Sequence, residues 1–237
     1  METVSQTIER GAAELGVALP PGAGAAFEKY YNMLEQRGKN VNLTAITGAQ
    51  DVIRLHFLDS LALLGSADFQ KARVIDVGSG AGFPGVPLKL AEPSIDLTLL
   101  DAKGKRVAFL SDLCAAIAID AVCVHARAEE LAHTPGMREQ FDIAVSRAVA
   151  QLNILCELSL PFVRVGGSFL AMKSYDSLEE REEARNAIDT LGAKIDGSIE
   201  YTIPGAGIKR LIIVIRKTSA TPEAYPRRFA KMQKAPL

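Results

Sequence analysis

The sequence has little cysteine, no long apolar run and almost no net charge, and each shortage excludes a class of protein. Its three cysteines are widely spaced and form no C-x-x-C pair, so we expect neither a disulfide framework nor a zinc site, and a reducing cytoplasm fits. No apolar run reaches the roughly 18 residues of a membrane-spanning helix. The first ten residues lack the basic start and apolar stretch of a signal peptide, so we expect no membrane partner.

The charge balance does not indicate a nucleic-acid partner by itself, because 27 Lys and Arg face 28 Asp and Glu. Such a partner would have to be held by a local basic surface. With 237 residues, of which 48% are hydrophobic and 23% charged, the chain suits one full globular domain with an extension.

Two hydrophobic patterns divide the chain. Apolar residues in 1–66 recur at helical spacing, whereas from Arg73 short apolar strands alternate with helices. Near-continuous Val, Ile and Leu content predicts strands buried on both faces of a parallel sheet. The strand candidates are 73–78, 96–102, 121–126, 141–147, 166–173 and 210–217, with a weaker one at 193–203.

This alternation, ending in one extra strand, predicts an α/β fold: a mostly parallel, seven-stranded sheet with helices on both faces and a helical N-terminal extension. We expect a helical cap over 1–66, the α/β core over 67–217 and a basic tail over 218–237, in which Glu223 is the only acid. Ser177-x-x-Glu180 predicts a capping box at the start of a helix.

A glycine-rich turn follows the first strand, in the segment VIDVGSGAGFPG at 74–85. Pro84 and Pro87 are tolerable there only in a first helical turn. Glycines at this point let the backbone approach a ligand at the carboxyl end of the strand.

The glycine turn is consistent with two cofactors, a dinucleotide such as NAD and S-adenosylmethionine. The glycine spacing over 80–85 satisfies the dinucleotide fingerprint, and Asp101 lies about 20 residues on, where a ribose contact is expected. Asp76, two residues before Gly78, would repel a pyrophosphate but could attract the methionine ammonium of S-adenosylmethionine. We therefore favour S-adenosylmethionine, with an NAD-linked oxidoreductase as the alternative.

Further motifs occur along the rest of the chain. They are 42–46 (NLTAI), 56–61 (HFLDSL), 78–90 (GSGAGFPGVPLKL), 100–101, 104–107, 126–130 (ARAEE), 146–148 (SRA), Lys173, 225–227 (YPR) and 236–237. In these motifs and their order the sequence resembles the bacterial small-subunit ribosomal RNA guanine-N7 methyltransferases, the RsmG family, also called glucose-inhibited division protein B.

The resemblance implies a Rossmann-like class I methyltransferase with S-adenosylmethionine as co-substrate, no metal, and 16S ribosomal RNA or the small ribosomal subunit as substrate. We expect a cytoplasmic monomer. By the resemblance Gly78, Gly80 and Phe83 line the cofactor pocket, Ala128 and Glu129 flank the adenine, and Arg147 lies beside the reaction centre.

Strand ends support the same location, because ligands of open parallel sheets bind at the carboxyl ends of the strands. Charged residues at or just past these ends are Asp76, Asp101, Arg127, Arg147 and Lys173. The candidate catalytic residues are Arg147, Lys173 and Arg127. The candidate cofactor-binding residues are Asp76, Gly78, Gly80, Phe83, Asp101, Ala128, Glu129 and Arg147.

Several of these residues also have purely structural interpretations. Asp101 could cap a helix, Arg147 could bridge Asp142, and Lys173 could be a solvated surface residue. His56 and Asp59 lie three apart on one helix face, so they can hydrogen-bond as a structural pair or take part in catalysis.

Guanine N7 carries a lone pair and no proton, so its methylation needs alignment rather than a general base. The sequence lacks the [DN]-P-P-[FY] segment of exocyclic amino methylation and a cysteine in a Pro-Cys context. We hypothesise that Arg147 orients a phosphate or guanine O6. The candidates for holding RNA are Lys103, Lys105, Arg106, Arg127, Lys173, Arg227, Arg228, Lys231 and Lys234. A small-molecule methyltransferase with 1–66 as a lid, and a noncatalytic RNA-binding protein, remain as alternatives.

Overall fold

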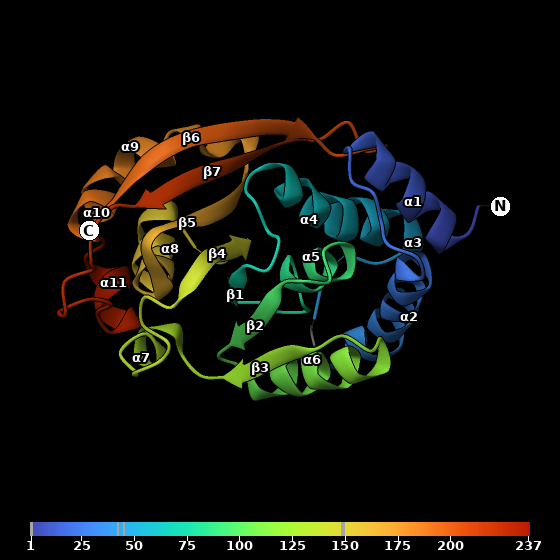
Figure 1. The fold of residues 1–237 in the computed structure, drawn as a ribbon, viewed down its shortest axis with the longest axis horizontal. Helices are drawn as coiled ribbons and strands as arrows, with labels where there is room; N and C mark the ends of the chain where they lie inside the picture. The colour runs from blue at the N-terminus through green and yellow to red at the C-terminus, as the bar shows by residue number, and fades with distance from the viewer. Residues whose placement is uncertain (1, 42, 45, 148–149) are drawn as a thin grey trace.

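The computed structural model describes residues 2–41, 43–44, 46–147 and 150–237. It contains a seven-stranded sheet in the order β3-β2-β1-β4-β5-β7-β6 (Figure 1). Strand β7 runs antiparallel to both of its neighbours, and the pairs from β3 to β5 are parallel. The strands are β1 (Arg73–Val77), β2 (Asp96–Asp101), β3 (Ala121–His125), β4 (Phe141–Arg147), β5 (Val163–Ser174), β6 (Ala193–Thr202) and β7 (Lys209–Lys217).

Helices cover both faces of this sheet. The N-terminal segment contains α1 (Val4–Glu14), α2 (Ala23–Val41), α3 (Ala49–Val52), the π-helical turn η1 (Ile53–Leu58), α4 (Asp59–Leu61) and the 3₁₀ turn η2 (Ala62–Gly65). The later helices are α5 (Gly85–Ala91), α6 (Gly104–Ala116), α7 (Ala128–Leu131), α8 (Leu152–Ser159), α9 (Glu180–Glu183), α10 (Arg185–Thr190) and α11 (Phe229–Lys234), with 3₁₀ turns η3 (Leu160–Phe162) and η4 (Tyr175–Leu178).

Two hydrophobic cores lie on the two faces, because successive residues of a buried strand point to opposite sides. In β1, Val74 belongs to the core that contains residues of α1, α2, α5 and α6, whereas Ile75 belongs to the core that contains residues of α8, α10 and α11. Figure 1 shows these two groups of helices on opposite sides of the sheet. The N-terminal helices therefore share one core with the sheet, with Phe27, Tyr30 and Phe57 fully buried in it.

The predicted α/β class, the seven strands and the two helical layers are confirmed. Strand β5 begins three residues earlier than predicted, and the register with β4 shifts between Phe141 and Ile143. The capping box is wrong: α9 has no side-chain cap, and the Glu180 carboxylate instead accepts hydrogen bonds from Lys173 and from the Leu152 amide.

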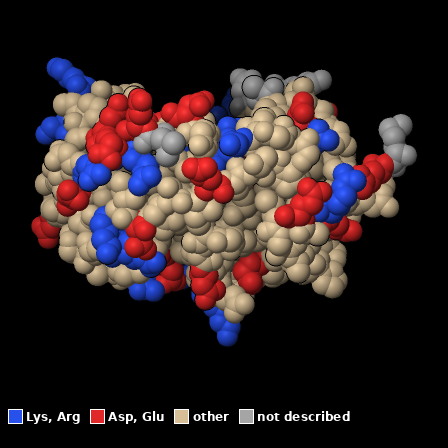
Figure 2. Space-filling model, turned by 90° about the horizontal axis from the view of Figure 1, so that it is seen from above, with Lys and Arg blue, Asp and Glu red and all other residues tan. Residues whose placement is uncertain are grey.

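The described helices include none that is long and apolar enough to cross a membrane. On the face drawn in Figure 2, Lys and Arg side chains are interspersed with Asp and Glu, in keeping with the balanced composition.

Candidate functional site

A cavity of about 460 Å³ opens at the carboxyl ends of β1, β2 and β4, the edge where open α/β sheets bind ligands. Its volume lies in the range of small-molecule and cofactor sites. The structure brings most of the predicted site residues together on its wall, namely Gly78, Gly80, Phe83, Asp101, Arg127, Ala128, Glu129 and Arg147.

The glycine turn needs its glycines for two different reasons. Gly78, Gly80 and Gly82 all have positive φ, of 80°, 59° and 106°. A Cβ on Gly80 would meet nothing closer than 3.9 Å, so this backbone faces open space that a ligand can enter. A Cβ on Gly82 would lie 2.6 Å from the Tyr30 hydroxyl and 2.9 Å from Val86, so this glycine permits close packing.

Asp101 ties the turn to the second strand. One carboxylate oxygen accepts a hydrogen bond from the Gly80 amide at 2.9 Å, and the other accepts one from the Lys103 amide at 2.8 Å. Arg106 lies 3.4 Å from the carboxylate, whose side chain is nearly buried. The residue therefore holds local structure and lines the cavity at the same time, since Oδ1, which accepts only the Lys103 amide, has a further lone pair.

Asp76 lies near the end of β1, as the sequence suggested, but its side chain is turned away from the cavity. Its side chain is fully buried and is absent from the described lining of the cavity. Oδ2 accepts a hydrogen bond from the Gly85 amide at 2.8 Å, where α5 begins, and burial raises the pKa of this carboxyl to about 7. The carboxyl therefore lies behind the glycine turn and outside the described lining, and its attraction of a ligand ammonium stays a prediction.

The far end of the cavity, past β3, combines a charged pair with apolar residues. Arg127 Nε donates to Glu129 Oε1 at 2.6 Å, and Ala128 lies between them at the start of α7. Leu158 of α8 and Phe229 of α11 complete this wall. Sequence reasoning missed both, because an apolar residue in a helix carries no signal that distinguishes a cavity wall from core.

Arg147 ends β4 and is held by the N-terminal helices. Its Nη1 donates to Asp59 Oδ2 at 2.9 Å and to the Leu55 carbonyl at 3.0 Å, and its Nη2 lies 2.9 Å from His56 Nδ1. The alternative bridge to Asp142 does not form, since that carboxylate contacts the Arg73 amide and Arg164. The guanidinium also lies 4.9 Å from the centre of the Phe83 ring.

His56 is fixed in one tautomer by these contacts. Because a guanidinium only donates, Nδ1 must accept, so the proton lies on Nε2, which is 2.7 Å from Thr44 Oγ1. The ring stacks on Phe83 with centroids 4.5 Å apart. Burial, together with the Arg147 charge, lowers the pKa of His56 to about 3. His56 and Asp59 thus each bind Arg147 rather than one another.

Asp59 connects this cluster to the β6–β7 hairpin. Tyr201 Oη donates to Asp59 Oδ1 at 2.8 Å, and Arg210 Nε lies 3.8 Å from the same oxygen. The Asp59 carboxylate is only 4% exposed, so it is a buried charge compensated mainly by Arg147.

A second cavity, of about 380 Å³, lies on the other side of this cluster. Arg147 and His56 line both cavities, and the second is also lined by Lys173, Arg210 and Tyr201. Lys173 is a half-buried, ion-paired residue rather than a solvated one, since its Nζ donates to the Ala150 carbonyl at 2.8 Å and to Glu180 at 2.6 Å.

The candidates for holding RNA divide into paired and exposed residues. Arg106, Arg127, Lys173 and Arg227 pair with Asp101, Glu129, Glu180 and Glu157. Those that form no ion pair among the described residues are Lys103, Lys105, Arg228, Lys231 and Lys234, all of them exposed. Arg210 and Lys209, at the start of β7, were not selected from the sequence. Asn42, Ala45 and Ala148 of the sequence motifs lie outside the described residues.

The buried neutral His56 predicts a specific loss of stability in acid. The unfolded chain binds a proton at this histidine below about pH 6.5, whereas the folded protein resists it down to about pH 3, so stability falls as pH drops through this window. From pH 7 to pH 5 we expect the wild type to lose about 2 kcal/mol more unfolding free energy than His56→Gln.

Urea titrations of both proteins at the two pH values test this. Asp76, whose raised pKa acts in the opposite direction, is present in both proteins and cancels in the comparison. Equal losses for the two proteins would contradict a neutral buried His56.

Known proteins resemble this chain in sequence and in fold. The GidB family model, described as rRNA small subunit methyltransferase G, matches residues 24–202. A protein named Ribosomal RNA small subunit methyltransferase G from Caldanaerobacter subterraneus subsp. tengcongensis is 43% identical over 98% of both chains. One of the same name from Streptococcus sanguinis is 40% identical over 95% of this chain and 96% of its own.

Among solved structures, that of M. jannaschii TYW2 in complex with AdoMet matches with a TM-score of 0.56 at 12% identity, over 73% of this chain and 79% of the other. A SAM-dependent methyltransferase from Aquifex aeolicus matches with a TM-score of 0.51 at 13% identity, over 70% and 92%. These likenesses show the Rossmann-like methyltransferase fold. By the match of its sequence over nearly its whole length, the chain belongs to the rRNA small subunit methyltransferase G (GidB) family.

Proposed function

We propose that this chain transfers a methyl group from S-adenosylmethionine to N7 of a guanine in 16S ribosomal RNA, acting as a cytoplasmic monomer. The observation that carries the proposal is the pair of cavities that share Arg147 and His56. One contains the glycine turn and the other the cations Lys173 and Arg210. A methyl donor and a nucleotide acceptor would then meet at one wall, as a direct transfer requires.

The residues of the first cavity fit the cofactor. The open backbone at Gly78 and Gly80 would receive the methionine part, Asp101 the ribose hydroxyls, and Ala128 with Glu129 the adenine. When bound, S-adenosylmethionine supplies an electrophilic methyl on a sulfonium. Arg127 would then act indirectly, by holding the Glu129 carboxylate in place.

Arg147 would orient the acceptor base. Three of its five N–H groups are used by Asp59, Leu55 and His56, which leaves Nε–H and one Nη2–H for a phosphate or guanine O6. Its charge is compensated by Asp59, and His56 is neutral. Arg147, Asp59 and His56 together therefore add no net positive charge next to a base that becomes cationic on methylation. Lys173 would line the path of the acceptor from the second cavity.

Each of the three segments of the chain has its own role in the proposed function. The cap, 1–66, supplies His56 and Asp59; the core, 67–217, supplies the cofactor cavity; and the tail, 218–237, carries exposed cations. Structured RNA is recognised largely through its backbone and shape, so a few phosphate contacts at the rim would suffice.

Mapping the product nucleoside tests the function. Purified protein, S-adenosylmethionine with a deuterated methyl group and unmodified small ribosomal subunits should yield labelled N7-methylguanosine in 16S RNA, identified by mass spectrometry. Protein-free 16S RNA in a parallel reaction distinguishes the free RNA from the assembled subunit as substrate. Label in another nucleoside, or none in either RNA, would overturn the proposal.

Removing Arg210 should weaken RNA binding selectively. We expect Arg210→Ala to raise KM for the RNA and to reduce the slope of log K against log salt by about 0.7 to 0.9, the contribution of one phosphate contact. Cofactor affinity should not change, because Arg210 lines only the second cavity. Arg185→Ala is the matched control, since that exposed arginine of α10 pairs with Glu182. An unchanged salt slope for Arg210→Ala would exclude the phosphate contact.

A further inference from the structure

Phe229 connects the C-terminal tail to the cofactor cavity. It is the first residue of α11, and its half-buried ring lines the first cavity together with Leu158, Ala128 and Glu129. The Arg127 guanidinium lies 5.4 Å from the centre of the ring. A segment expected to serve RNA alone therefore also forms part of the wall of the cavity.

The tail is fixed just before Phe229 by a buried ion pair. Arg227 Nε donates to Glu157 Oε1 at 2.8 Å and Nη2 to Oε2 at 2.6 Å, while the Arg227 amide donates to Oε1 at 2.8 Å. Such a two-pronged contact is strong and specific in direction. Glu157 is 1% exposed and directly precedes Leu158 of the cavity wall, as Arg227 stands two residues before Phe229. The ion pair therefore joins α8 to the start of α11 beside the cavity.

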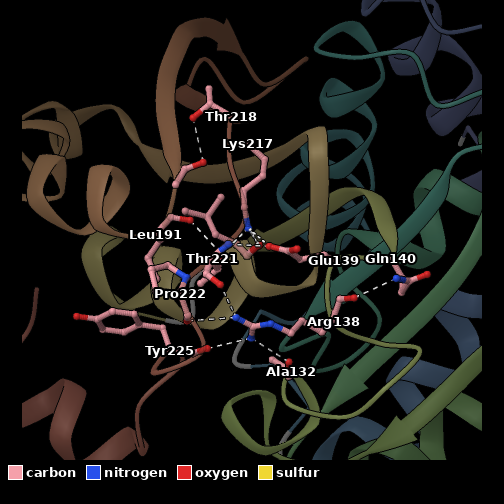
Figure 3. Close-up of polar contacts among 12 residues, drawn as sticks. Ala132, Arg138, Glu139, Gln140, Leu191, Lys217, Thr218, Thr221, Pro222 and Tyr225 are labelled. Carbon is pink, nitrogen blue, oxygen red and sulfur yellow. Dashed lines mark hydrogen bonds and ion pairs between the residues drawn. The ribbon is translucent and has the colours of Figure 1, made fainter.

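A second group of contacts fixes the beginning of the tail (Figure 3). Arg138 donates to the Thr221 carbonyl at 2.7 Å and to the Tyr225 carbonyl at 2.9 Å. Lys217, fully buried at the end of β7, lies 3.1 Å from Glu139, which also accepts from the Thr221 amide at 2.7 Å. Figure 3 shows these side chains converging on the chain between Lys217 and Tyr225. The tail is thus attached along its length, so the position of Phe229 is fixed by the fold.

The chemistry of this part of the wall suits a purine ring. Leu158, Ala128 and Phe229 offer apolar and aromatic surface, and Glu129 offers an acceptor for an amino group. The exposed cations of the tail, Arg228, Lys231 and Lys234, remain available to the solvent. We propose that Phe229 is a cofactor-binding residue whose ring forms the outer wall of the adenine site, held there by the Arg227–Glu157 pair. This inference rests on the proposed use of S-adenosylmethionine.

Titration calorimetry with S-adenosylhomocysteine, adenosine and methionine as separate probes tests the inference. We expect Phe229→Ala to raise Kd for S-adenosylhomocysteine and for adenosine by about tenfold, the size of one aromatic contact, and to leave methionine binding unchanged. Phe229→Tyr should restore most of the affinity. Gln233→Ala, an exposed substitution on the same helix, is the matched control.

The anchor is tested separately through the state of the tail. Glu157→Gln should raise Kd for adenosine as Phe229→Ala does, and should speed tryptic cleavage after Arg228. S-adenosylhomocysteine should slow that cleavage in the wild type more than in Phe229→Ala. Wild-type affinity of Phe229→Ala for adenosine would overturn the inference, whereas a wild-type protein that binds neither S-adenosylmethionine nor S-adenosylhomocysteine would overturn the proposed function instead.

Discussion

Replacing Arg147 with alanine should reduce methyl transfer by about 100- to 1,000-fold, because a loss of alignment at the reacting atoms costs at least that much. Affinity for S-adenosylhomocysteine should remain close to that of the wild type, since Arg147 lies at the end of the cavity shared with the second one. Single-turnover transfer to small ribosomal subunits, together with calorimetry, separates the two effects.

Stability has to be controlled in this experiment. Arg147→Ala leaves Asp59 as a buried carboxylate without its main cation, at a cost of about 3 to 5 kcal/mol. The double variant Arg147→Ala with Asp59→Asn removes that charge, and should recover the stability without recovering transfer. Arg147→Lys keeps the charge but loses the planar fork, so we expect partial activity at most.

Arg164→Ala provides the matched control. This arginine pairs with Asp142 at the opposite end of β4, so its loss should leave transfer unchanged. Wild-type transfer by a folded Arg147→Ala protein would show that the arginine only stabilises the contact between the cap and the sheet.

Replacing Asp101 with alanine should raise Kd for S-adenosylhomocysteine by about 100-fold. Hydrogen bonds to a charged group contribute about 1.5 to 3 kcal/mol each, and the variant loses the ribose contacts proposed here. It also loses the acceptor for the Gly80 amide, so the turn itself becomes less ordered. Calorimetry measures the affinity, and urea unfolding should show a loss of about 2 to 4 kcal/mol.

Two further variants identify the cause of the weaker binding. Asp101→Asn keeps one carbonyl acceptor, and we expect an intermediate Kd from it. Asp96→Ala removes a carboxylate at the other end of the same strand, where it meets Arg73 at the surface, and should bind like the wild type. If Asp101→Ala binds as tightly as the wild type, the carboxylate serves the turn alone.

Local signals account for the features that the sequence predicted well. The strands of the core were found because continuous Val, Ile and Leu runs of strand length fit a sheet covered on both faces. The glycine turn was found because Gly78, Gly80 and Gly82 adopt left-handed conformations that glycine tolerates best. Charged residues at strand ends indicated the correct edge of the sheet, since topology alone brings those ends together.

The sequence did not show how deeply a polar side chain is buried or which residue it pairs with. Asp76 stands at the correct edge, but α5 covers its side chain and its carboxyl binds the Gly85 amide. For Lys173, a candidate catalytic residue, the alternative of a solvated surface residue does not hold, because its Nζ pairs with Glu180. Arg227, one of the candidates for holding RNA, pairs with the buried Glu157. The partners are Gly85 at the start of α5, Glu180 at the start of α9 and Glu157 in α8. Their positions depend on how these helices pack on the sheet.

The sequence by itself determined the fold class, the edge of the sheet where the cavity opens and the family, because these follow from hydrophobic pattern, backbone conformation and conspicuous motifs. Only the tertiary structure decided which residues hold Arg147 and which residues complete the wall of the first cavity. Asp59 and His56 reach Arg147 from about 90 residues away in the chain, and Phe229 reaches the cavity from the tail. Such contacts arise when separate elements bury their apolar faces against one sheet, and no local pattern records which polar groups that burial brings together.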